Sequence, residues 1–189
     1  MSKKPPEFTI GVMGFDIGEF GVDPSVACFR YGGYVEPLIV MDSGVDTILT
    51  GDRGIVEYKN RNVSMGNVDA TGVGTGVAPY MQRQGCSANP VKVASKPTER
   101  TELGEFYILR DQLWWACREW LRTDPGAMLP PDELLIEELQ TPTYEVMGGK
   151  IRVMKKGTMR ELLKRSPDRA DALCLTFAST GFFEGCDFT

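Results

Sequence analysis

The feature that most constrains the fold is a short apolar run near the start of the sequence that ends on an acid. Residues 8–15 have the length and composition of a buried strand, and Asp16 follows at once. A carboxylate at the end of a buried strand is costly unless a metal ion, a ligand cation or a basic side chain meets it. The alternative is that Asp16 bonds to its own backbone in the next turn, as aspartates often do.

The same arrangement recurs twice. Residues 63–68 read as a strand that is followed by Asp69. Near the end of the sequence, Ser166 is predicted as the N-cap of a helix that carries Asp168 and Asp171. Asp168 is explained as a first-turn acid that interacts well with the helix dipole. Asp171 lies among apolar residues and therefore needs a paired charge or a metal ion.

Composition narrows the chemistry. The chain has 189 residues, 42% of them hydrophobic and 25% charged, which suits one domain with a substantial core. No apolar stretch reaches the ~18 residues needed to span a bilayer. The five cysteines form no CxxC pair, and there is no histidine. An imidazole base, a Ser-His triad and a His-ligated metal are thereby excluded, so chemistry must rest on carboxylates, amines, thiols, hydroxyls or a bound ion.

The remaining elements predict an α/β domain. We expect residues 25–35 and 37–41 to pair with the first strand as an antiparallel meander, and residues 90–94 to add a further core strand. Gly72, Gly74 and Gly76 open a helix that runs to about residue 84; this turn either brings backbone amides close to a phosphate or is only a tight connection. Helices are expected at residues 46–59, 101–122 and 132–139, and a hairpin at residues 144–154 around two glycines.

A basic segment stands out from an acidic chain. Residues 150–169 carry a net charge of +6, whereas the rest of the chain carries −11. We expect the second strand of the hairpin to hold most of this stripe. It is either a phosphate-binding surface beside a carboxylate site or a solvated, lysine-protected edge. Its members are Lys150, Arg152, Lys155, Lys156, Arg160, Lys164, Arg165 and Arg169.

Three acids at the ends of buried elements suggest a known chemistry. Two Mg²⁺ or Mn²⁺ ions held by a carboxylate cluster stabilise the attacking and leaving oxygens in phosphodiester hydrolysis. These ions prefer carboxylate and water ligands and need no histidine. The absence of histidine is therefore consistent with such a site.

Several segments together resemble the C-terminal nuclease domain of the large terminase subunit of tailed bacteriophages. They are GFDIGEFGVD, NVDATGVGTGV and GGKIRVMKKGTMRELLKRSPDRADALCLTFA. The resemblance implies a ribonuclease H-like fold, in which an antiparallel meander plus parallel strands form a mixed sheet flanked by helices, with an added basic β-hairpin. The domain would span residues 9–180, with residues 1–8 as a linker and residues 181–189 as a tail.

The resemblance also assigns roles to residues. Asp16, Asp69 and Asp171 would be the catalytic ligands of two Mg²⁺ or Mn²⁺ ions, with Asp23 and Asp168 as accessory acids. Double-stranded DNA would contact a larger set, namely Lys150, Arg152, Lys155, Lys156, Arg160, Lys164, Arg165, Gly72 and Gly74.

By the same resemblance, the activity would be an endonuclease that cuts concatemeric viral DNA into genome units during packaging in the host cytoplasm. An ATPase motor domain, the small terminase subunit and the portal would be its partners, and no membrane is involved. This sequence contains no P-loop, so ATP-driven translocation is not assigned to it. A junction resolvase or ribonuclease H of the same fold, and a non-catalytic docking module, are the alternatives.

Overall fold

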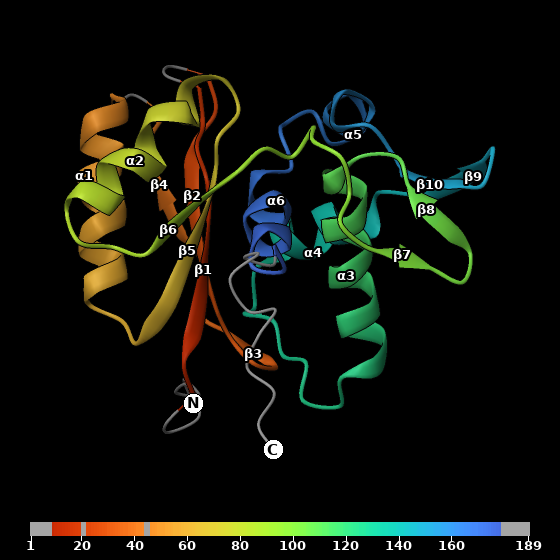
Figure 1. The fold of residues 1–189 in the computed structure, drawn as a ribbon, viewed down its shortest axis with the longest axis horizontal. Helices are drawn as coiled ribbons and strands as arrows, with labels where there is room; N and C mark the ends of the chain where they lie inside the picture. Colours follow the sequence, from red (N-terminus) through yellow and green to blue (C-terminus); the bar gives the residue numbers. More distant parts are fainter. Residues whose placement is uncertain (1–8, 20–21, 44–45, 179–189) are drawn as a thin grey trace.

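A mixed six-stranded sheet forms the centre of the part of the chain that the computed structural model describes, residues 9–19, 22–43 and 46–178 (Figure 1). The strand order is β3-β2-β1-β5-β6, with β4 also paired to β2. β1 runs antiparallel to β2 and parallel to β5, and β5 runs parallel to β6. The strands are β1 (Gly11–Asp16), β2 (Ser25–Tyr31), β3 (Tyr34–Val35), β4 (Ile39–Met41), β5 (Val63–Asp69) and β6 (Ala88–Val91).

Helices cover both faces of this sheet, with α1 and α2 on one side and α6 and α3 on the other (Figure 1). Because side chains alternate along a strand, each strand supplies both layers. In β2, Ala27 and Phe29 pack in the cluster with α1 and α2, whereas Val26 and Cys28 pack in the cluster with α3 and α6. The helices are α1 (Thr47–Lys59), η1 (Gly72–Gly76), α2 (Val77–Arg83), α3 (Leu109–Thr123), α4 (Glu133–Gln140), α5 (Lys156–Leu163) and α6 (Asp168–Leu175).

A second, smaller sheet lies beyond α3 (Figure 1). Its order is β7-β8-β10-β9, and Phe106 and Ile151 pack with Trp115 of α3 to join sheet and helix. Gly148 and Gly149 have φ of +58° and +75°, which a two-residue hairpin turn requires. The strands are β7 (Arg100–Thr101), β8 (Gly104–Phe106), β9 (Tyr144–Met147) and β10 (Lys150–Val153). No helix in the described residues is long and apolar enough to cross a membrane.

The predicted fold class is confirmed: a mixed sheet of meander and parallel strands is flanked by helices and carries an added hairpin. Local signals located several elements well. Asp46 caps α1 by accepting from the amides of Ile48 and Leu49, and α2 follows the glycine string and stops near Gly85, which has φ of +82°. The expectations for residues 1–8 fall outside the described residues, as do those for residues 181–189.

The helix predicted at residues 101–122 was wrong in its first third. α3 begins at Leu109, and the preceding residues form β7 and β8 instead. The amides of Glu105 and Tyr107 bond to carbonyls of the distant hairpin segment, at 3.1 and 2.9 Å. Gly104, at φ +136°, passes so close to Gly149 that a Cβ would lie 2.2 Å from its carbonyl oxygen. A helix here would break these sheet bonds.

Three smaller expectations also need correction. β6 is displaced toward the N-terminus of the predicted strand, because its pairing with β5 runs from Ala88 to Val91. Of the basic stripe, only Lys150 and Arg152 lie on β10, and the other members lie just before α5, on it or after it. The N-cap of α6 is Pro167 and not Ser166, whose hydroxyl bonds to the carboxylate of Asp168.

Candidate active site

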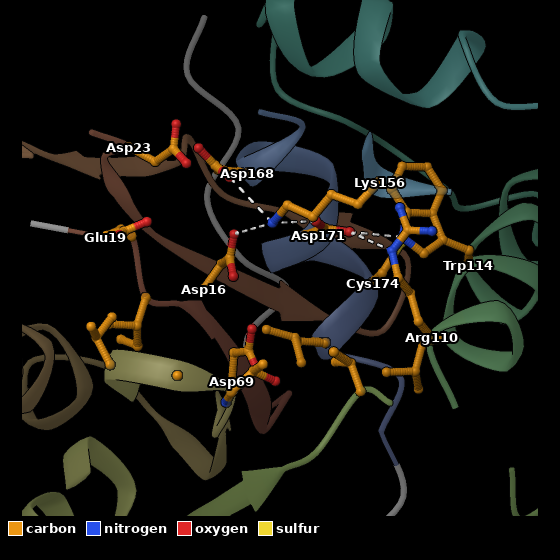
Figure 2. Close-up of a pocket in the computed structure, with 18 residues that line it drawn as sticks. Asp16, Glu19, Asp23, Asp69, Arg110, Trp114, Lys156, Asp168, Asp171 and Cys174 are labelled. Carbon is orange, nitrogen blue, oxygen red and sulfur yellow. Dashed lines mark hydrogen bonds and ion pairs between the residues drawn. The ribbon is translucent and has the colours of Figure 1, made fainter. Parts of the chain in front are cut away.

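A cavity of about 390 Å³ opens where the carboxyl ends of β1 and β5 meet the first turn of α6. Figure 2 shows the side chains that line it. Among the described residues, six acidic side chains contribute to its wall and two cations face them. The acids are Asp16, Glu19, Asp23, Asp69, Asp168 and Asp171, and the cations are Arg110 and Lys156.

The fold explains why these acids meet. Asp16 and Asp69 are the last residues of two parallel neighbouring strands, so both lie at the same edge of the sheet. α6 lies directly on β1: a Cβ at Gly14 would be 2.0 Å from the carbonyl oxygen of Ala172. Only glycine permits this approach, which carries the acids of the first turn of α6 over the end of β1.

An ammonium group stands at the centre of the acids. Lys156, the first residue of α5, places its Nζ 2.8 Å from Asp171 Oδ2, 3.5 Å from Asp168 Oδ1 and 3.6 Å from Asp16 Oδ2 (Figure 2). Burial alone would lower the pKa of Lys156, but the three carboxylates outweigh burial and raise it. The structure thus gathers three of the predicted acids around one positive charge.

Asp171 is the best-stabilised member of the group. Its Oδ1 accepts a hydrogen bond of 2.8 Å from Trp114 Nε1 and lies 3.5 Å from Arg110 Nε. Burial raises the pKa of Asp171, yet Lys156, Arg110 and the hydrogen bonds from Lys156 and Trp114 together hold it below its ordinary value. This carboxylate is therefore ionised at neutral pH.

The other acids are less well compensated. Asp16 is 3% exposed, and burial, with the nearby charges of Asp171 and Asp168, raises its pKa well above the usual range despite Lys156. Burial also raises the pKa of Asp168 and of Asp69. Asp69 lines the cavity and accepts a 3.0 Å bond from the amide of Thr71. These acids need more positive charge than the chain supplies.

The accessory acid Asp23 and the predicted glycines also border the cavity. Asp23 forms an ion pair with Arg160 of α5. Gly72, at φ +57°, lines the cavity, and Gly74 sits where a Cβ would be 2.2 Å from the carbonyl oxygen of Asp69. The glycine string therefore makes a tight 3₁₀ turn behind Asp69; its predicted contact with DNA stays a prediction.

The basic stripe divides into two groups. Four members face acids: Lys156 within the cavity, Arg160 against Asp23, Arg165 against Glu137 and Glu138, and Arg169 against Asp132. The others point to solvent or stack. Arg152 lies over the ring of Tyr107 at 3.8 Å, and within the described residues no ion pair is found for Lys150, Lys155 or Lys164, all exposed.

Sequence reasoning missed three residues of this cavity: Glu19, Arg110 and Trp114. Glu19 follows Asp16 by three residues and belongs to the same loop. Arg110 precedes Trp114 by one helical turn on an apolar face, which is a signal that a buried cation meets an acid there. Lys156 was expected to contact DNA, but in the structure its side chain points into the acid cluster.

In the described part of the chain, no three acidic or cysteine side chains stand in an arrangement that holds a metal ion as they are. The donor set is nevertheless of the right kind. Four aspartates supply only oxygen ligands, which Mg²⁺ and Mn²⁺ prefer. Lys156 lies where three of them converge, so its ammonium has the place and sign of a bound cation.

Together, the strand order of the mixed sheet and the helices on both of its faces define an α/β fold of the ribonuclease H-like type (Figure 1). Comparison with solved structures finds this fold in the nuclease domain of the large terminase subunit gp2 of bacterial virus Sf6, with a TM-score of 0.74 and 20% identity over 94% of this chain and 90% of that one. A mutant of that domain, with manganese and beta-thujaplicinol, matches with a TM-score of 0.73 and 19% identity over 95% of this chain and 90% of that one.

The large terminase nuclease from thermophilic phage G20c with bound magnesium is also similar, with a TM-score of 0.63 and 20% identity over 92% of this chain and 83% of that one. No protein-family model and no curated protein matches the sequence. The resemblance predicted from the sequence is thus confirmed for the fold, over nearly the whole chain.

Proposed function

We propose that this chain is a divalent-metal-dependent endonuclease that hydrolyses double-stranded DNA during the packaging of a viral genome. The observation that carries the proposal is the convergence of Asp16, Asp168 and Asp171 on one ammonium, beside Asp69, at the sheet edge. The fold supports it, because solved domains with this fold are named as terminase nucleases and include complexes with manganese and magnesium.

We assign the ligand roles to Asp16, Asp69 and Asp171, with Asp23 and Asp168 as accessory acids. Lys156 and a divalent ion would compete for the same oxygens, so the ammonium must withdraw before an ion is held. Its side chain is 41% exposed and its stem is flexible, so a rotamer change toward solvent would withdraw the ammonium.

Two bound Mg²⁺ or Mn²⁺ ions would supply an activated water and stabilise the leaving oxygen. The chain's own residues have other tasks. Trp114 and Arg110 keep Asp171 ionised and in place. The raised pKa values of Asp16 and Asp69 fall once positive charge is added, so both become ionised when they are needed. Lys156, once displaced, remains at the mouth as a partner for a phosphate.

The proposed DNA path follows the exposed cations. Lys150, Lys155 and Lys164 carry charge that no acid of the described chain pairs with, and Arg152 presents its guanidinium on Tyr107. Phosphate contacts of this kind give affinity that is independent of sequence and sensitive to salt. We propose that an ATPase motor, the small terminase subunit and the portal hold the DNA at this domain in the host cytoplasm.

Plasmid cleavage tests the proposal. Wild-type protein should nick and linearise plain plasmid with Mn²⁺ or Mg²⁺ and do neither with chelator. The variants Asp16→Asn, Asp69→Asn and Asp171→Asn should each lose cleavage, whereas Asp46→Asn, at the exposed cap of α1, should keep it. Near wild-type cleavage by any of the first three removes that residue from the site. Selective cutting of four-way junctions or RNA–DNA hybrids would indicate a resolvase or ribonuclease H instead.

A further inference from the structure

The two oxygens of Asp171 have different surroundings. Oδ2 faces the cavity and meets Lys156 at 2.8 Å. Oδ1 points to α3, where Trp114 Nε1 donates to it at 2.8 Å and Arg110 Nε lies 3.5 Å away (Figure 2). One oxygen is thus held by the protein interior, and the other is left for whatever cation the cavity contains.

The two α3 side chains are themselves fixed. Arg110 and Trp114 are one turn apart, 9% and 5% exposed, and the guanidinium lies over the indole ring at 4.9 Å. Arg110 Nη1 donates to the carbonyl oxygen of Met154 at 3.0 Å, and Nη2 contacts Met159 Sδ at 3.2 Å. Arg110 Nε has no hydrogen-bond partner within the described residues and faces Asp171 alone.

These contacts link the acid to the segment that carries its cation. Met154 follows β10 and Met159 lies in α5, so they bracket Lys156 in the sequence. The neighbouring side chain of Asp111 adds a second tie, since its Oδ1 accepts from the amide of Val153 at 3.0 Å. One turn of α3 therefore sets both the orientation of Asp171 and the start of α5.

We infer that Trp114 and Arg110 are positioning residues that restrict Asp171 to binding a divalent ion through Oδ2 alone. The inference rests on the proposed function, because it concerns the same metal site. Partners that hold a metal ligand from outside typically contribute 10–100-fold to metal affinity. Replacing Trp114 with phenylalanine keeps an aromatic ring but removes the N–H donor, and so frees Oδ1.

The test measures Mn²⁺ affinity by electron paramagnetic resonance, together with the Mn²⁺ concentration for half-maximal plasmid cleavage. Trp114→Phe should weaken binding about 10-fold and raise that concentration in step, with less change in the rate at saturating Mn²⁺. Trp120→Phe is the matched control. Trp120 lies on the same helix but away from the cavity, and it donates a similar hydrogen bond of 3.1 Å to Asp124. Thermal melts should show similar stability losses in both variants.

The outcomes separate the inference from the function beneath it. If Trp114→Phe binds Mn²⁺ like Trp120→Phe while Asp171→Asn loses binding, the positioning role is overturned and the metal site stands. If Asp171→Asn also binds Mn²⁺ with normal affinity, both the positioning role and the proposed metal site are wrong. Arg110→Lys keeps the charge but not the three-point contact of the guanidinium. It should weaken Mn²⁺ binding in the same direction, and an unchanged affinity there would also count against the inference.

Discussion

Replacing Asp16 with asparagine should stabilise the metal-free protein while abolishing cleavage. Asp16 is 3% exposed, and burial together with Asp171 and Asp168 raises its pKa well above the ordinary value despite Lys156. The folded state therefore binds a proton at this carboxyl at a pH where the unfolded state does not. Stability falls as pH rises from the ordinary pKa to the folded one, and is constant above it. Asparagine resembles the protonated form of Asp16, so the variant does not lose stability as pH rises.

The magnitude follows from the cost of burying a polar group whose partners are incomplete. Such a group typically costs about 1–3 kcal/mol of stability, and asparagine removes the part that comes from the negative charge. We therefore expect the variant to gain about 2 kcal/mol at pH 7. For a domain of this size that corresponds to a rise in Tm of about 4–8 °C.

The assay is thermal unfolding in chelator between pH 4 and pH 8. The difference in Tm between Asp16→Asn and wild type should be near zero at pH 4 and widen as pH rises. Saturating Mn²⁺ should narrow it, because binding stabilises the wild type more. Asp46→Asn is the control for the same chemical change outside the cavity: Asp46 is exposed, asparagine caps a helix about as well as aspartate, and this variant should gain no stability at pH 8. A pH-independent difference, or an Asp16→Asn variant less stable than wild type at pH 8, would refute the reasoning.

Three further predictions concern other charged side chains. Lys156→Met should lower Tm in chelator but much less in Mn²⁺. Removing one partner of a buried ion pair costs about 3–5 kcal/mol, and the 41% exposure of Lys156 reduces this to about 2 kcal/mol. An equal drop in Tm in both media would contradict this prediction. The triple variant Lys150→Ala, Lys155→Ala and Lys164→Ala should weaken DNA binding. The slope of log K against log salt concentration should become less steep by about 0.9 for each phosphate that the variant no longer neutralises. An unchanged slope would mean that the basic stripe is only a solvated edge. Burial raises the pKa of Glu138 from 4.5 to about 7. Folding therefore takes up a proton at this carboxyl between those pH values, which costs up to about 3 kcal/mol of stability by pH 7. In urea titrations, Glu138→Gln should make the decline of stability between pH 4.5 and pH 7 less steep.

Three acids of the cavity could be predicted because each conflicts with its immediate neighbours in the sequence. Asp16 and Asp69 each end an apolar run of strand length, and Asp171 interrupts an apolar helix. Such a carboxylate conflicts with its neighbours unless something positive meets it. That conflict is visible without knowing the fold. The resemblance then added the parallel pairing that brings two strand ends together, which no local pattern contains.

The features that could not be predicted depend on contacts between residues far apart in the sequence. The start of α3 was misplaced because β8 bonds to β10, about 45 residues later. Lys156 looked like one more member of a basic run, and only the packing of α5 beside α6 turns its ammonium inward. Trp114 looked like core, and it is core, but its indole N–H reaches an acid 57 residues away. Periodicity identifies a buried face without saying what polar group it meets.

The balance of charge in the cavity also orders the events of the proposed reaction. Among the described residues, six acids and two cations line the wall, so the metal-free cavity repels a phosphate backbone. Lys156 reduces that repulsion but cannot both stay among the carboxylates and bind DNA. Divalent ions held by these acids would resolve the conflict, because their charge would neutralise the carboxylates and leave Lys156 free to face the mouth. Metal loading should therefore precede productive DNA binding, and until then the proposed DNA contacts would be limited to the exposed cations outside the cavity.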